Sequence, residues 1–137
     1  SAALAGLVCA CGGGAGAPPG AADVDRAAQG LERAVREQDA RLALACDLDD
    51  VEESSWTTEE AAVVSPTLDD AMAHVLQDEI WSSFGLPDGR RDAVVEHAVQ
   101  IGHGTFVPVL VDRSLRVLLA VEPHDDGFTI AGALMCR

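Results

Sequence analysis

The chain has 137 residues, 48% of them hydrophobic, and carries 23 acidic against nine basic side chains for a net charge of −14. This length and apolar content fit one globular domain with a core of its own, and they exclude a disordered chain. The strong negative charge argues against nucleic-acid binding and against electrostatic docking on anionic lipid, because both need clustered Lys or Arg.

The first 22 residues are predicted to lie outside the folded domain. Residues 1–10 are apolar but too short to span a bilayer, and they resemble the end of a secretory signal. The run from Val8 to Cys11 resembles a bacterial lipobox, which predicts lipid modification of Cys11, although Cys9 stands where such motifs usually have Ala, Ser or Thr. Residues 12–20 are rich in Gly and Pro and predict a flexible linker. We therefore expect a lipid-anchored or secreted protein of the cell envelope, with a cytoplasmic protein as the alternative.

Helices are predicted in the next part of the chain. Residues 22–45 place apolar side chains at three- and four-residue spacing, which predicts an amphipathic helix about six turns long. Residues 47–55 are acidic but lack the central Gly of an EF-hand, so they predict a solvated loop and no calcium site. A short helix is predicted over 57–65 and a longer one over 67–84, which Thr67 would cap.

The C-terminal third predicts a sheet. Strands are predicted at 92–101, 105–112, 115–121 and 128–136. The turns between them are short, and short turns allow only antiparallel neighbours. Pro108 cannot donate to a ladder, so it predicts an edge position or a bulge. The whole predicts a single α+β domain over 23–137, in which the N-terminal helices pack on one face of a curved, four-stranded antiparallel meander.

Two segments, Ala34–Cys46 at the end of the first helix and Asp126–Arg137 at the close of the chain, resemble the nuclear transport factor 2-like superfamily. The similarity is to its small secreted or lipid-anchored members from high-GC bacteria. It implies a cone-shaped sheet around a pocket, and cones of this type often pair as homodimers. In enzymes of this superfamily an Asp or His deep in the cone moves a proton. This implies a general base at His97, on the apolar face of the first strand; a hydrogen-bonded core histidine is the alternative.

The remaining side chains of chemical interest are cysteines and aromatic residues. Cys46 and Cys136 are predicted to form a disulfide if the domain is exported, and to be buried thiols if it is not. No set of His or Cys has the spacing of a metal site, so neither a metal nor another cofactor is predicted. The predicted pocket walls are aromatic: Trp56, Trp81, Phe106 and Phe128.

Three functions remain open from the sequence. The leading hypothesis is an envelope-tethered, non-enzymatic domain that binds a small apolar ligand or a protein partner, with no nucleic acid, and with membrane contact only through the lipid on Cys11. The first alternative is a small isomerase, dehydratase or hydrolase with His97 as its base. The second is a structural module that forms homodimers.

Overall fold

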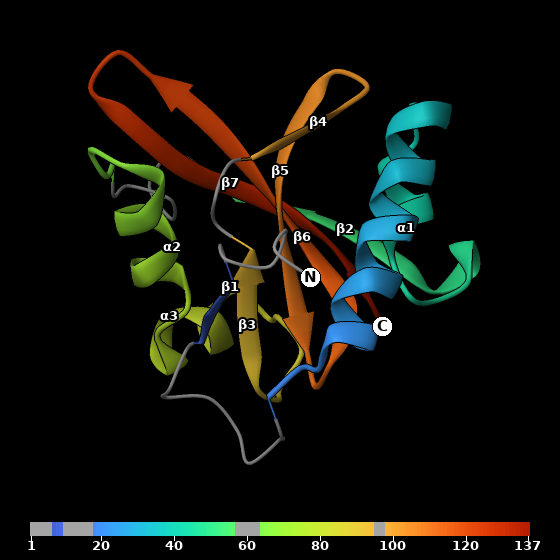
Figure 1. The fold of residues 1–137 in the computed structure, drawn as a ribbon. Helices are drawn as coiled ribbons and strands as arrows, with labels where there is room; N and C mark the ends of the chain where they lie inside the picture. The colour runs from blue at the N-terminus through green and yellow to red at the C-terminus, as the bar shows by residue number, and fades with distance from the viewer. Residues whose placement is uncertain (1–6, 10–17, 57–63, 95–97) are drawn as a thin grey trace.

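A computed structural model of the chain describes residues 7–9, 18–56, 64–94 and 98–137. It is an α+β protein in which an open antiparallel sheet separates helices on its two sides (Figure 1). The strands are β1 (Leu7–Cys9), β2 (Val51–Ser55), β3 (Arg91–Val94), β4 (Val99–Ile101), β5 (Gly104–Val111), β6 (Ser114–His124) and β7 (Gly127–Cys136). The helices are α1 (Ala21–Glu37), α2 (Leu68–Val75) and α3 (Asp78–Ser83), with the short 3₁₀ turns η2 (Ala40–Ala43) and η3 (Leu48–Asp50).

The predicted meander is present at the centre of the sheet. Strands follow the order β1-β3-β5-β6-β7-β2, and β4 also pairs with β5. The first predicted strand, 92–101, is in fact two strands: β3 pairs with Val109–Val111 and β4 with Gly104–Phe106. Pro108 lies in a central strand and not at an edge, as was one expectation. It pairs with Leu118 of β6 and lies next to a register shift between Val109 and Leu110, which agrees with the other expectation, a bulge.

Two strands were not predicted, and both lie at the edges of the sheet. β2 pairs with β7 along its whole length, so the acidic segment 47–55 is not simply a solvated loop. β1 pairs with β3, so residues 7–9 of the predicted signal remnant contribute to the sheet. The sheet therefore exceeds the four strands that the sequence predicted.

The helices are shorter than predicted. α1 ends at Glu37 because Gln38 adopts a left-handed conformation (φ 55°), and Asp39 then caps η2. The long helix expected over 67–84 is divided into α2 and α3 at Gln77, whose ψ of 139° is extended. Its predicted cap is confirmed, since the Thr67 hydroxyl accepts a hydrogen bond of 3.1 Å from the Asp70 N–H. The helix expected over 57–65 falls largely outside the described residues.

The helices cover both faces of the sheet, which corrects the expected single helical layer. One set of alternating side chains packs under α2 and α3: Val107, Val109, Val111, Val117, Leu119, Ala133 and Met135. The other set packs under α1 and η2: Leu110, Leu115, Leu118, Leu134 and Cys136. Strands β5 to β7 are apolar on both faces, so helices on one face alone would leave the second set in water. The sheet is open and covered on both sides, and the expected cone arrangement is not confirmed.

Candidate ligand-binding site

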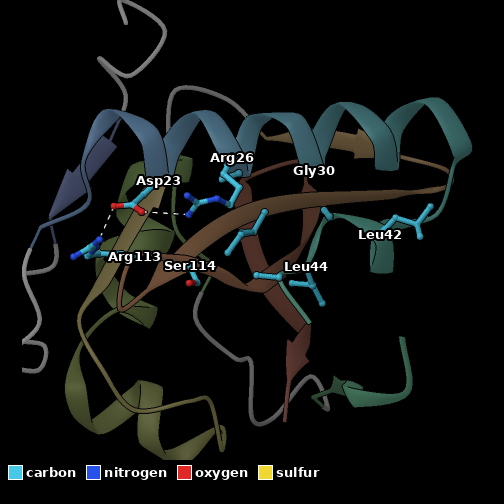
Figure 2. Close-up of a pocket in the computed structure, with 11 residues that line it drawn as sticks. Asp23, Arg26, Gly30, Leu42, Leu44, Arg113 and Ser114 are labelled. Carbon is cyan, nitrogen blue, oxygen red and sulfur yellow. Dashed lines mark hydrogen bonds and ion pairs between the residues drawn. The ribbon is translucent and has the colours of Figure 1, made fainter. Parts of the chain in front are cut away.

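A pocket of about 290 Å³ lies between α1, the segment around η2 and the turn from β5 to β6 (Figure 2). Its lining combines a charged rim with an apolar interior. The lining residues are Asp23, Arg26, Ala27, Gly30, Leu42, Ala43, Leu44, Ala45, Arg113, Ser114 and Leu115.

The turn between β5 and β6 fixes one side of the rim. Asp112 and Arg113 both have positive φ, 49° and 72°, as a two-residue type I′ turn requires. The turn is held in place by Arg90, whose N–H donates to the Asp112 carboxylate at 3.0 Å and whose carbonyl accepts from the Asp112 N–H at 2.9 Å. These bonds offset the cost of the left-handed conformation and present Arg113 to the first turn of α1.

Asp23 is the centre of the rim. Its carboxylate accepts hydrogen bonds from the Gly20 N–H (3.0 Å), from Arg26 Nη1 (3.4 Å) and from Arg113 Nε (3.1 Å). The hydrogen bond from the Gly20 backbone lowers the pKa of Asp23, and the positive charges of Arg113 and Arg26 lower it further. Figure 2 shows the two arginines on either side of the carboxylate. Asp23 is thus ionised at neutral pH and ties the helix start to the hairpin tip.

The interior of the pocket is apolar and held by close backbone packing. Gly30 lets α1 approach η2, because a Cβ at this position would lie 2.9 Å from the Ala43 carbonyl oxygen. The Ala45 N–H donates to the Leu115 carbonyl at 2.8 Å, which fixes the segment after η2 against β6. Leu44 and Leu115 are both buried, so the floor of the cavity belongs to the core under α1.

The chemistry of this lining suits binding better than catalysis. The polar groups among its side chains are two guanidinium groups, one carboxylate and the Ser114 hydroxyl. The Asp23 carboxylate is ionised and already accepts hydrogen bonds from the Gly20 N–H and from two arginines. An apolar cavity with a cationic rim instead fits a molecule with an apolar body and a negative group.

The predicted disulfide is present behind the pocket wall. Cys46 is bonded to Cys136, with their Cα atoms 6.0 Å apart. The bond follows Ala45 directly and ties the segment after η2 to the end of β7. It indicates an oxidising environment, as expected for an exported domain.

The four aromatic residues predicted as pocket walls do not line this cavity. Trp81 is fully buried among the side chains under α2 and α3, and its indole N–H donates to the Pro87 carbonyl at 2.7 Å. Trp56 stacks on Phe84 with ring centroids 4.1 Å apart, and Phe128 packs against the same core. Phe106 lies on the other face of the sheet, the one that carries α1, but it lines a separate groove there.

Two of the residues predicted from the sequence lie outside the described part of the chain. These are His97, the proposed general base, and Cys11, the proposed lipidation site. Within the described ranges, no group of three or more His, Cys, Asp or Glu gathers in a way that could hold a metal ion. Nor does any helix described by the structure have the length and apolar character needed to cross a membrane.

Sequence reasoning missed the rim of the pocket. The local signals are present: Asp23 stands three residues after Gly20, where a first-turn acid reaches back to the chain, and Arg113 lies in a tight turn between two strands. The contact between Asp23 and Arg113 is a tertiary contact, because it depends on how α1 packs across the sheet. No pattern along the chain specifies that packing.

No family model, no curated protein and no solved structure matches this chain. The resemblance to the nuclear transport factor 2-like superfamily therefore stays a prediction, and the site must be interpreted from its own residues.

Proposed function

We propose that this protein is a non-enzymatic domain of the cell envelope, and that it binds a small molecule with an apolar body and an anionic head. The observation that carries this proposal is the convergence of Arg26 and Arg113 on a single carboxylate at the mouth of an apolar cavity. The Asp23 carboxylate neutralises only one of the two guanidinium groups, so an anion at the mouth of the pocket would meet a net positive charge. The apolar body would then contact Leu42, Leu44 and other lining side chains.

The experiment compares two probes that differ in the head group. Octanoate and 1-octanol are titrated into the full chain, and binding is followed by calorimetry and by amide chemical shifts. We expect octanoate to bind and the uncharged alcohol to bind at least tenfold more weakly, since one charge-assisted hydrogen bond is worth about 1.5 to 3 kcal/mol. Equal binding of the two probes would remove the anionic head from the proposal, and binding of neither would remove the site.

Matched variants tie the binding to this pocket. Arg113→Ala should weaken octanoate about tenfold, whereas Arg116→Ala, which removes an exposed arginine outside the lining, should not. Ala45→Phe puts a ring into the lining from an exposed position, and Ala28→Phe puts the same ring on an exposed part of α1 outside it. If octanoate binding is weakened by Arg113→Ala and Ala45→Phe but not by Arg116→Ala and Ala28→Phe, the ligand binds in this pocket.

The envelope location rests on the Cys46–Cys136 disulfide and on the lipobox-like run ending at Cys11. Signal removal before Cys11 would also remove β1 from the sheet. The mature protein would then present β3 as an edge strand. Mass spectrometry of native protein tests this: we expect a membrane fraction that begins at a diacylglyceryl Cys11. A cytosolic chain that retains Leu7–Cys9 contradicts the lipid anchor.

A further inference from the structure

β2 forms the second edge of the sheet. β2 pairs with β7 on one side, and no strand in the described ranges pairs with its other side. Two hydrogen bonds to β7 and its end flank β2: the Arg137 N–H donates to the Asp50 carbonyl, and the Trp56 N–H donates to the Ala131 carbonyl. They show which residues of β2 direct their backbone groups toward β7. The backbone N–H and C=O groups of Val51, Glu53 and Ser55 are therefore directed away from β7. These groups can pair with a further strand.

An apolar groove of about 320 Å³ lies beside this edge, on the face that carries α1. Its lining residues are Glu53, Ser54, Ser55, Phe106, Ala120, Ala131, Gly132, Ala133 and Leu134. Ala120 of β6 is paired with Gly132 of β7. Because both residues are small, they leave space above the sheet at the bottom of the groove. Gly132 also lets β2 come close, because a Cβ there would lie 2.5 Å from the Ser54 carbonyl oxygen. The groove can receive a bulky apolar side chain.

The negative charge of β2 favours a basic binding partner. Glu52 and Glu53 are exposed on opposite faces of β2, and the chain as a whole carries a net charge of −14. A second copy that paired β2 with β2 would bring these carboxylates together, and like charges in neighbouring strands are destabilising. An extended segment with Arg or Lys beside the two glutamates would instead pair with both of them.

We propose that β2 and the adjoining groove form a docking site for a basic, extended segment of another protein, which adds to the sheet as a strand. The backbone of the segment pairs with Val51, Glu53 and Ser55, its basic side chains lie next to Glu52 and Glu53, and one bulky apolar side chain enters the groove beside Phe106. This site is separate from the pocket under α1, and it depends on neither that pocket nor its ligand.

A synthetic peptide tests the site directly. The probe is fluorescein-labelled Thr-Arg-Arg-Val-Phe-Thr, with its ends blocked, added to the full chain and followed by anisotropy. We expect saturable binding that weakens at least tenfold when both arginines are replaced by Glu, and that is lost when the peptide backbone is N-methylated at alternate positions. A dissociation constant weaker than about 1 mM for the Arg peptide, or equal binding of the N-methylated peptide, overturns the proposal.

Variants of the protein locate the binding. Glu53→Lys should weaken the Arg peptide about tenfold, while Glu32→Lys, the same charge change on an exposed position of α1, should leave it unchanged. Ser55→Pro removes one outward N–H from the edge and should weaken binding even where charge is intact. Equal effects of the two Lys variants would assign the binding to net charge and overturn the site. A wild-type dimer that Ser55→Pro dissociates would assign the edge to a second copy, and it would overturn the proposal as well.

Discussion

Arg113 donates a hydrogen bond of 3.1 Å to Asp23 across 90 residues of sequence, and so joins the tip of the β5–β6 hairpin to the first turn of α1. The contact connects the helix that covers one face of the sheet with the strands that form its centre. It also puts one cation of the pocket rim where a ligand would meet it.

The Asp23 contact predicts a specific dependence of stability on pH. The pKa of Asp23 is lowered from 3.8 in the folded protein, first by the Gly20 N–H and then by the arginine charges. Its contribution is therefore fully present above the unfolded value and is lost as the pH falls through the folded value. We expect Asp23→Asn to lower the free energy of unfolding by a constant amount from pH 7 to roughly pH 5, and by less and less below about pH 4.

Urea unfolding of the wild type and the variant across this range measures the difference. Asp25→Asn removes one exposed carboxylate from the same helix without touching the ion pair, and it serves as the control. A wild-type advantage that grows as the pH falls would contradict the role given to Asp23.

The disulfide predicts a large loss of stability on its removal. Cys46 and Cys136 close a loop with a sequence separation of 90. The loop-entropy relation gives about 4 to 5 kcal/mol for a loop of this length. We expect the double variant Cys46→Ala, Cys136→Ala to lose an amount of this order in denaturant titrations.

Reduction of the wild type should reproduce the loss, and the double variant should not respond to reductant. A double variant as stable as the oxidised wild type would show that the surrounding contacts already restrict this loop.

Much of the fold could be predicted from the C-terminal third, because its signals are local. Gly102 and Gly104, the turn at Asp112 and Arg113, and the turn before Gly127 each specify a tight reversal between apolar runs. The turn geometry then determines the antiparallel order of the strands.

The edge strand and the helical layers could not be predicted in this way. β2 has a single apolar residue, Val51, and its conformation comes from pairing with β7. The division of helices between two faces depends on which side chains each helix meets, although the two apolar faces of β5 indicate that both need cover. The pocket under α1 follows from that division, so it was missed together with it.

Arg91 predicts a strong effect from a buried charge outside the pocket. It is only 4% exposed, donates to the Leu76 carbonyl at 2.7 Å, and its guanidinium lies 5.1 Å from the centre of the Trp81 ring. Arg91→Ala should cost about 3 kcal/mol, because the carbonyl of Leu76, the C-cap residue of α2, loses its donor, Asp78 loses its ion-pair partner and the Trp81 ring loses its packing.

The conservative variant separates the two causes. Arg91→Met keeps the aliphatic stem near Trp81 and removes the charge together with its donors, so it should cost less than Arg91→Ala. Chemical denaturation checks both, with Arg116→Ala expected to change stability by no more than about 0.5 kcal/mol. Equal losses in the two Arg91 variants would mean that the hydrogen bonds, and not the packing, dominate.

At Gly30, two effects of a substitution by alanine oppose each other: a gain in helix propensity and a clash with the neighbouring backbone. Alanine in a helix interior is favoured over glycine by about 1 kcal/mol, so propensity alone predicts that Gly30→Ala is stabilising. Its new methyl group would lie 2.9 Å from the Ala43 carbonyl oxygen, which is backbone and cannot rotate aside as a side chain can. We expect the clash to prevail: unfolding becomes easier, α1 shifts away from η2, and octanoate binding weakens. Gln29→Ala, on an exposed position of the same helix, should be neutral or slightly stabilising. A Gly30→Ala protein that gains the full propensity and binds octanoate normally would show that α1 has room to move over η2.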